Sequence, residues 1–112
     1  MSGAGLLVLV ATPIGNLGDL SQRAVEVLSA ADLIACEDTR RTGLLLSHAG
    51  ITGSSLLRVD QHTEEAAAGK VIRRLSEGAS VAVVTDAGTP GISDPGERLV
   101  RRVLDAGFEV SM

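Results

Sequence analysis

The stretch VAVVTDAGTPGISDPGERLV, residues 81–100, passes from an apolar run through a small polar segment into a helix start. Its first four residues, Val81–Val84, are mostly β-branched and predict a buried strand. The segment 86–94 then holds small residues, carboxylates and hydroxyls with almost no bulk. The run DPGE at 94–97 predicts a helix, with aspartate as N-cap, proline in the first helical position and glutamate in the capping-box position. The predicted order is therefore strand, loop, helix.

This loop is a candidate ligand-binding segment. In open α/β sheets ligands bind beyond the carboxyl ends of the strands, and glycines there let a ligand approach the backbone closely. The alternative is a plain polar turn between two elements. A turn needs only one or two glycines and a cap, whereas this segment combines DAGTP with ISDPG. Because long ordered loops in compact domains are usually functional, we favour the binding loop.

The rest of the chain repeats the alternation of apolar strand and amphipathic helix. Further strands are predicted at Leu6–Ala11, Asp32–Cys36 and Ser55–Val59, with a fifth opening at Phe108. Helices are predicted after an Asp19 cap with Gln22 completing a capping box, and at Thr42–His48, Glu64–Ser76 and Pro95–Ala106, the last two ended by Gly78 and Gly107. The last helix is expected to bury Leu99, Val100, Val103 and Leu104. This order predicts an α/β fold with a mostly parallel five-stranded sheet flanked by helices on both faces.

The composition limits the classes of function. The chain has 112 residues, 45% of them hydrophobic, which is enough for one domain with a core and not comfortably for two. Its net charge of −4 argues against strong nucleic-acid binding by this chain alone, and its single aromatic residue cannot build a base-stacking platform. The one cysteine, Cys36, excludes an internal disulfide and a structural zinc cluster, and its apolar surroundings predict a buried, inert thiol. We find no signal peptide and no apolar run of membrane-spanning length, and we expect a cytoplasmic protein with no membrane partner.

Polar clusters follow three of the predicted strands: EDTRR at 37–41, DQHTE at 60–64 and the loop at 86–94. Because the carboxyl ends of parallel strands meet at one edge of a sheet, all three are expected to face the same edge. A weak internal echo, ATPIG at 11–15 and GTPGI at 88–92, adds a second Thr-Pro segment there. Neither GxGxxG nor GxxxxGK[ST] occurs, so the usual dinucleotide and Walker-type motifs are missing. This edge is the predicted site.

Each cluster has more than one interpretation. Metal ligation by the acidic residues of 37–41 together with Asp86 is conceivable, but their spacing is not diagnostic and carboxylates more often cap helices, so we expect no metal. His62 and Glu64 form an acid–base pair in one interpretation and part of a solvated loop in the other. The pair Arg40–Arg41 either holds a phosphate or neutralises the neighbouring carboxylates.

Three blocks of the chain resemble the signatures of a known family. They are VATPIGNLGDLSQRA at 10–24, ACEDTRRTGLLL at 35–46 and VTDAGTPGISDPGERLV at 84–100, and they run in order across nearly the whole chain. Together they resemble the small-subunit ribosomal RNA methyltransferase I family of the tetrapyrrole methylase superfamily. The resemblance implies transfer of a methyl group from S-adenosylmethionine to the ribose 2′-hydroxyl of a cytidine in the decoding region of small-subunit (16S) ribosomal RNA. It also implies two α/β domains with the cofactor in the cleft between them, and usually a homodimer.

The chain departs from the family pattern in three places. Thr85 replaces the serine of the usual SDAG, which exchanges one hydroxyl for another. Thr63 stands where the HxHNE segment has asparagine, while His62 and Glu64 are kept. The chain also stops before the PGPSA-type segment and the second domain of the family. We therefore expect residues 1–112 to form a single α/β domain, the N-terminal half of a two-domain enzyme, that alone binds cofactor weakly and does not turn over.

Carried over by position, the resemblance assigns functions to residues of these clusters. The cofactor wall comprises Pro13, Ile14, Gly15, Asp86, Gly88, Thr89, Gly91 and Ile92. A ribose hydroxyl is a poor nucleophile, and the candidates to activate it are Glu37, Asp38, His62 and Glu64. Glu37 and Asp38 are slightly favoured because they follow a strand terminus directly, and Arg40 and Arg41 are candidates to contact RNA phosphate. Since a sulfonium is already a good leaving group, alignment and exclusion of water should supply most of the acceleration.

Two rival functions stay open. One is a methylase of the same superfamily that acts on a small molecule, such as a corrinoid precursor, or on a protein; those members tend to carry GDP in the central loop, where this chain has Gly88-Thr89-Pro90. The other is a noncatalytic ligand-binding or assembly module, which predicts no methyl transfer even in a complete protein. For an RNA substrate, the acidic charge of this chain requires a basic surface from a C-terminal domain or a dimer partner.

Overall fold

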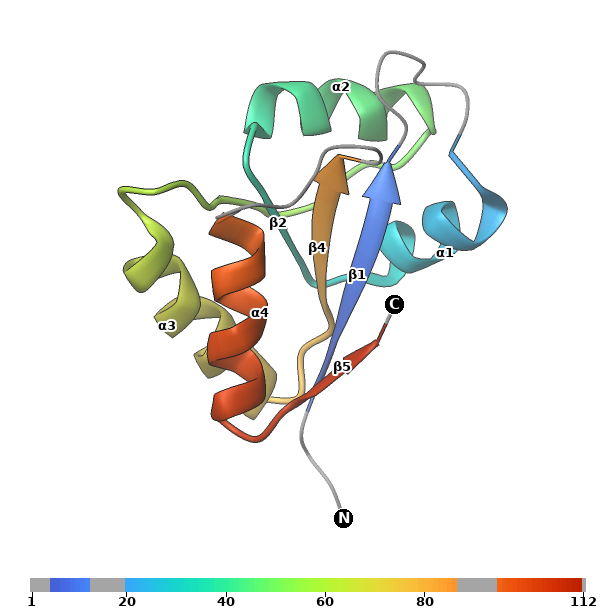
Figure 1. The fold of residues 1–112 in the computed structure, drawn as a ribbon. Helices are drawn as coiled ribbons and strands as arrows, with labels where there is room; N and C mark the ends of the chain where they lie inside the picture. Colours follow the sequence, from blue (N-terminus) through green and yellow to red (C-terminus); the bar gives the residue numbers. More distant parts are fainter. Residues whose placement is uncertain (1–4, 13–19, 87–94, 112) are drawn as a thin grey trace.

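The computed structural model of the protein describes residues 5–12, 20–86 and 95–111, in which five strands alternate with four helices. The strands are β1 (Leu6–Thr12), β2 (Leu33–Cys36), β3 (Leu56–Arg58), β4 (Val81–Asp86) and β5 (Glu109–Ser111). The helices are α1 (Gln22–Ala30), α2 (Thr39–His48), α3 (Glu64–Ser76) and α4 (Pro95–Asp105). The predicted alternation of strand and helix is confirmed (Figure 1).

The described strands form one sheet in the order β3-β2-β4-β1-β5, and all of their pairings are parallel. β1 and β4 share the longest pairing, which runs from Leu7 opposite Val81 to Thr12 opposite Asp86. β4 pairs with β2 on its other side. The residues Val81–Val83 at the start of β4 are fully or almost fully buried, as expected for a central strand of a parallel sheet with helices on both faces.

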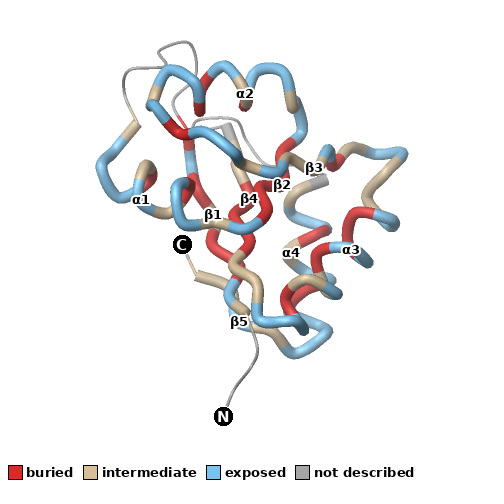
Figure 2. The backbone as a smooth tube through the Cα atoms, turned by 180° about the vertical axis from the view of Figure 1, so that it is seen from behind, coloured by how far each residue is buried: buried red, intermediate tan, exposed pale blue. Residues whose placement is uncertain are grey.

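Helices cover both faces of the sheet, two on each face (Figure 1). On one face, Leu75 of α3 and Leu99 of α4 pack in one core with Val83. On the other face, Leu28 of α1 and Leu46 of α2 belong to a second core that contains Ala82. Val83 and Ala82 join different cores because successive side chains of a strand point to opposite faces. Figure 2 shows the buried residues concentrated along β1, β2 and β4, between the two helical layers.

The distribution of the helices over the two faces makes the carboxyl end of β4 a topological switch point of the sheet. The chain leaves β1 and β2 for α1 and α2 on one face, but it leaves β4, which lies between those two strands, for α4 on the other face. Open α/β sheets bind ligands where neighbouring strands connect to helices on opposite faces. The end of β4 has such a switch toward each of its neighbours, and the predicted binding loop starts there.

The first helix begins later than the sequence predicts. α1 starts at Gln22, and its N-cap is Ser21, whose Oγ accepts a hydrogen bond from the Ala24 N–H at 3.0 Å. The prediction that Asp19 caps this helix is therefore wrong; Asp19 itself lies outside the described residues. A serine is as good an N-cap as an aspartate, and this one stands closer to the apolar face of the helix.

The second helix begins earlier than predicted, at Thr39 and not at Thr42. Its N-cap is Asp38, whose Oδ1 accepts a hydrogen bond from the Arg41 N–H at 3.0 Å. A cap of this kind satisfies one of the backbone N–H groups that a helix start leaves without partners, and it contributes typically about 1 kcal/mol. Most of the charged run 37–41 is therefore the first turn of a helix.

Other helix ends follow the sequence closely. α3 spans the predicted Glu64–Ser76. Gly78 and Gly107, both predicted to end helices, have φ values of 89° and 92°. Glycine adopts this left-handed conformation with little strain, which is why it stands just beyond the ends of α3 and α4.

The buried face of α4 is narrower than predicted. Leu99 and Val103 are buried, as expected for residues one turn apart. Val100 is only half-buried, and Leu104 is 53% exposed, so the prediction that Leu104 belongs to the core is wrong. One step along a helix turns about 100°, which carries Leu104 away from the face that holds Val103.

Two glycines allow a paired test of this packing. The Gly5 N–H donates to the Leu75 carbonyl at 2.8 Å, and a Cβ on Gly5 would overlap the Ala79 carbonyl oxygen. Gly5→Ala should therefore destabilise the chain by about 1–3 kcal/mol, the usual cost of overpacking. Gly69 is exposed within α3, and no described atom lies within 4 Å of its Cβ position. Gly69→Ala should stabilise the chain by about 0.5–1 kcal/mol, because alanine loses less backbone entropy in a helix. Urea unfolding measures both changes, and shifts of the same sign in the two variants would contradict this account.

Candidate active site

The carboxyl ends of β1 and β4 are joined side by side. Thr12, the last residue of β1, is 4% exposed, and its Oγ1 donates a hydrogen bond to the Thr85 carbonyl at 3.2 Å. Figure 1 shows the arrowheads of both strands at the same edge of the sheet, where the two segments predicted to contact cofactor begin. Of the predicted wall, Asp86 is described as the last residue of β4, and the others lie outside the described residues: Pro13, Ile14, Gly15, Gly88, Thr89, Gly91 and Ile92.

The carboxylates that follow β2 stand at this same edge, because β2 is a neighbour of β4. Glu37 and Asp38 are both exposed. One carboxylate oxygen of Asp38, Oδ1, accepts the hydrogen bond that caps α2. Glu37 has no hydrogen bond or ion pair with any other described residue, so both of its oxygens are available to a ligand. Within the described ranges, no group of three His, Cys, Asp or Glu side chains is arranged to hold a metal ion.

Two arginines occupy the first turn of α2, and both are exposed. Across the described part of the chain, no ion pair joins Arg40 to Glu37 or to Asp38. Arg41 donates its backbone N–H to Asp38, so it has a part in the cap of the helix. Both interpretations of Arg40, contact with a phosphate and neutralisation of the acids, stay open.

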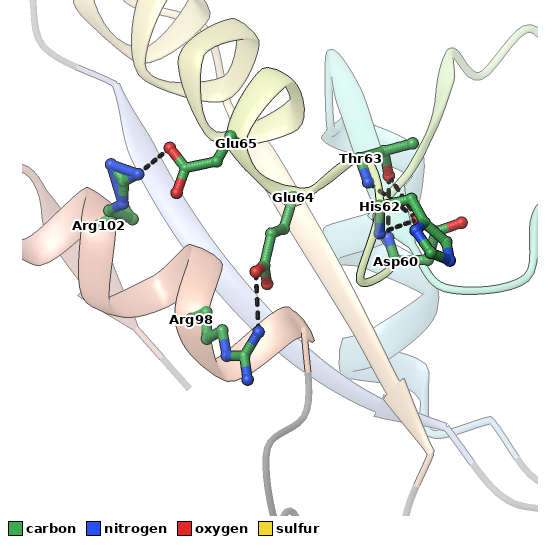
Figure 3. Close-up of polar contacts among 7 residues, drawn as sticks. All are labelled: Asp60, His62, Thr63, Glu64, Glu65, Arg98 and Arg102. Atoms are coloured by element: carbon green, nitrogen blue, oxygen red, sulfur yellow. Dashed lines mark hydrogen bonds and ion pairs between the residues drawn. The ribbon is translucent and has the colours of Figure 1, made fainter.

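The turn between β3 and α3 is held by a reciprocal pair of hydrogen bonds, drawn in Figure 3. Asp60 Oδ1 accepts the Thr63 N–H at 2.9 Å, and Thr63 Oγ1 accepts the Asp60 N–H at 3.0 Å. Asp60 Oδ1 also accepts the His62 N–H at 2.8 Å, and its Oδ2 lies 3.0 Å from Arg58 Nε. Thr63 thus closes the turn through its hydroxyl. It stands at the position where the family that the sequence resembles has asparagine.

The same contacts change the acidity of Asp60. The hydrogen bond from the His62 N–H is the main reason that the pKa of the Asp60 carboxyl lies below its ordinary value. Hydrogen bonds from Thr63 and the positive charge of Arg58 lower the pKa further, while desolvation opposes them. Sequence reasoning did not single out Asp60, although Asp side chains commonly form turns by accepting the backbone N–H two residues further on, as Asp60 does from His62.

The structure does not bring His62 and Glu64 together. His62 is exposed and lies on the turn with Asp60, whereas Glu64 points across to α4 (Figure 3). Glu64 Oε1 accepts a hydrogen bond from Arg98 Nη1 at 2.8 Å. Glu64 Oε2 is buried and has no hydrogen-bond partner among the described residues. An acid–base pair of these two residues therefore has no support in this geometry.

A second ion pair joins the same two helices, between Glu65, which follows Glu64 on α3, and Arg102, one turn beyond Arg98 on α4. These pairs line an open groove between α3 and α4. Sequence reasoning missed both pairs. The available signal was the i, i+4 spacing of Arg98 and Arg102, which places two cations on one side of a helix, but it does not say which element they meet.

Cys36, the last residue of β2, is buried, as predicted. Burial raises the pKa of its thiol, Asp38 adds to this effect through its negative charge, and a hydrogen bond with Thr42 opposes it. A thiol of raised pKa forms little thiolate at neutral pH, so Cys36 is a packing residue rather than a nucleophile.

The parallel sheet, with its switch point at the end of β4, defines an open α/β protein, a class that binds ligands beyond the carboxyl ends of its strands. The profile of the Tetrapyrrole (Corrin/Porphyrin) Methylases matches residues 6–112. The chain belongs to this family. The family resemblance and the fold expected from the sequence are thereby confirmed.

Curated relatives narrow the comparison. The chain is 54% identical over 106 residues to ribosomal RNA small subunit methyltransferase I of Escherichia coli O157:H7, which covers 95% of this chain and 37% of that protein. The proteins of the same name from Haemophilus influenzae and Synechocystis sp. are 50% and 52% identical over 95% of this chain. The chain spans 37–38% of the length of these three relatives.

Solved structures show the same fold at lower sequence identity. A uroporphyrin-III-C-methyltransferase from Thermus thermophilus superposes with a TM-score of 0.70 at 22% identity, over 96% of this chain and 46% of that one. A diphthine synthase superposes with a TM-score of 0.71 at 16% identity, over 96% of this chain and 43% of that one. In the described part of this chain, none of the helices is both long and apolar enough to span a membrane.

The lowered pKa of Asp60 predicts how stability depends on pH. A carboxyl whose pKa falls on folding contributes stability above its unfolded pKa, and this contribution is lost as the pH falls through the folded pKa. Asp60→Ala should therefore lower Tm at pH 7, and the difference from the wild type should narrow below about pH 4. Thermal unfolding followed by circular dichroism at pH 7, 5 and 3 checks this.

Ser21→Ala is the matched control for Asp60→Ala. It removes the N-cap of α1, which is made by a hydroxyl and not by a carboxylate. Its loss of Tm should stay nearly constant over the same pH range. If the Asp60→Ala difference is as constant as that of Ser21→Ala, the charge of Asp60 does not hold the turn.

Proposed function

We propose that this chain is the N-terminal, cofactor-binding domain of an enzyme that uses S-adenosylmethionine to methylate the RNA of the small ribosomal subunit. One observation carries the proposal: proteins named ribosomal RNA small subunit methyltransferase I are 50–54% identical to this chain over 95% of its length. The position of the predicted binding loop at the switch point of the sheet supports the same conclusion. The acceptor in this proposal is the ribose 2′-hydroxyl of a cytidine in the decoding region.

The described part of the edge suits an adenosyl ligand. It offers the exposed carboxylates of Glu37 and Asp38, which can accept hydrogen bonds from ribose hydroxyls, beside strand ends whose spacing the Thr12–Thr85 bond fixes. The residues that would hold the cofactor are those of the predicted wall, at 13–15, 86, 88–89 and 91–92. When bound, S-adenosylmethionine supplies a methyl group activated by its sulfonium.

In this proposal the carboxylates after β2 also act on the methyl acceptor, the ribose hydroxyl of the RNA. Glu37 is exposed, and its side chain makes no hydrogen bond or ion pair with other described residues, so it is the group best suited to orient a ribose hydroxyl and accept its proton. The oxygen of Asp38 that does not cap α2 is the alternative acceptor. His62 stays a candidate on its exposed turn, and its backbone N–H is fixed by Asp60.

RNA contact begins in this proposal at α2. Arg40 and Arg41 extend from its first turn at the carboxyl edge and would meet phosphate. A chain of net charge −4 needs a further basic surface, which we assign to the remainder of a longer protein or to the second subunit of a homodimer. The proposed setting is the cytoplasm, where ribosomal subunits are the substrate.

Methyl transfer is tested on the complete product of the gene that encodes this chain. The protein is incubated with methyl-labelled S-adenosylmethionine and small ribosomal subunits from a strain that lacks the gene, and the RNA is digested to nucleosides. We expect label in 2′-O-methylcytidine. Cofactor binding without labelled RNA would overturn the RNA substrate and favour a small molecule or protein acceptor. Absence of cofactor binding would overturn the methyltransferase and leave a noncatalytic module.

Substitution of the two carboxylates tests their roles in the same assay. Glu37→Gln and Asp38→Asn should each lower kcat on the order of 100-fold if the residue takes the proton, with a smaller effect on cofactor affinity. Asparagine caps a helix as well as aspartate does, so Asp38→Asn should leave Tm nearly unchanged. Glu26→Gln, on the exposed side of α1, is the control and should leave kcat unchanged. Unchanged kcat in both edge variants would remove these residues from the mechanism.

A further inference from the structure

We infer that Glu64 is a positioning residue, whose ion pair with Arg98 fixes the first turn of α4 against the turn that carries His62. This inference rests on the proposed function, since it concerns the edge at which cofactor and RNA would bind. It also changes the assignment of Glu64, which the sequence offered as a candidate for proton transfer.

The two partners stand where two polar clusters of the edge meet their helices. Glu64 is the first residue of α3 and follows directly on the turn that Asp60 and Thr63 close. Arg98 lies in the first turn of α4, which begins directly after the predicted binding loop. Glu64 and Arg98 are 34 residues apart in sequence, yet their side chains meet at 2.8 Å (Figure 3). The pair therefore joins two parts of the edge that the backbone does not connect locally.

The partial burial of Glu64 makes this ion pair sensitive above all to the loss of Arg98. The Glu64 side chain is 19% exposed, and its Oε2 is buried without a partner among the described residues. A carboxylate in this setting depends on Arg98 for compensation of its charge, because water reaches it poorly. Arg98 itself is 53% exposed, so its loss leaves the less solvated partner uncompensated.

The backbone on both sides of the pair is anchored, so the ion pair sets orientation rather than creating the fold. Leu99, next to Arg98, is 1% exposed and packs in the same core as Ala67 and Ala68 of α3. This core holds α3 and α4 together whether or not the ion pair is present. What the pair adds is the angle of the two helix starts at the carboxyl edge, where small displacements of binding groups are costly.

The pair between Glu65 and Arg102 provides an internal comparison. It joins the same helices with the same chemistry, but its side chains are 76% and 46% exposed. Arg102 lies one turn beyond Arg98 on α4, while Glu65 directly follows Glu64 in the first turn of α3. Exposed pairs of this kind contribute little to stability, and Arg102 lies outside the first turn of α4, which the pair of Glu64 and Arg98 is inferred to fix. A difference between the two pairs therefore reports position and burial and not the mere presence of a charge.

The test is a double-mutant cycle in the complete gene product, with Glu64→Gln, Arg98→Gln and the double variant. Isothermal titration calorimetry gives the Kd for S-adenosylmethionine, thermal unfolding gives Tm, and the labelling assay gives kcat at several pH values. We expect each single variant to raise Kd about tenfold, and the double variant to be no worse than either single one, because both changes disrupt one contact. Glu65→Gln and Arg102→Gln should leave Kd within about twofold of the wild type.

Three results would overturn the inference. A lower Tm with unchanged Kd and kcat would make the pair merely structural. A loss of kcat in Glu64→Gln that Arg98→Gln does not share, with loss of a limb of the pH profile, would return Glu64 to proton transfer. Equal effects of the Glu65 and Arg102 variants would show that position is irrelevant. Failure of the wild-type protein to bind S-adenosylmethionine is a different result, since it overturns the proposed function before any variant is compared.

Discussion

The pairing of β1 with β4 is the constraint on which the rest of the fold depends. These strands lie at the middle of the sheet, and the Thr12–Thr85 hydrogen bond joins residues 73 positions apart in the sequence. A parallel pairing over that distance requires crossovers, and the chain between the two strands supplies β2, β3 and the three helices α1–α3. Closing so long a connection costs entropy that only the burial of both faces offsets, which is why the residues of β4 that face the cores are apolar. The same pairing places the carboxyl ends of β1 and β4 at one edge of the sheet. The location of the candidate site therefore follows from the strand pairing that folding requires.

The elements of this fold could be predicted because their signals are local. The apolar strands and the glycines after α3 and α4 each act within a few residues, and α3 was predicted to its observed ends. The predicted start of α2, at Thr42, was wrong for an equally local reason. Asp38 was interpreted only as part of a chemical cluster, whereas its carboxylate also caps the helix. One side chain can serve both purposes, and a sequence pattern does not divide them. The prediction that Leu104 is buried was wrong because an apolar side chain does not by itself place a residue on the buried face of a helix.

The contacts of the candidate site were harder to predict than its location. That the polar clusters share an edge follows from the parallel order of the strands alone. Which side chains meet there depends on how α3 and α4 pack, and proximity in sequence is misleading. His62 and Glu64 are two residues apart, but one belongs to a turn and the other begins a helix, so they point to different neighbours. Glu64 meets Arg98 instead, a partner that becomes visible only when the shared core of the two helices is known.

The formal charge of the chain does not show where its charges lie. Asp38 caps a helix, Asp60 holds a turn and pairs with Arg58, and Glu64 and Glu65 pair with arginines of α4. A carboxylate paired with a cation projects little field beyond its neighbourhood, and the same holds for the arginine it pairs with, so these pairs leave the net charge of −4 unchanged and only shift where the uncompensated charges lie. What a polyanion meets is the local arrangement, and at the start of α2 this arrangement presents the exposed Arg40. The positions of the charges, rather than their sum, therefore decide whether this edge can approach phosphate. At the edge that folding creates around β4, the exposed Arg40 and the exposed Glu37 lie close in sequence at the start of α2.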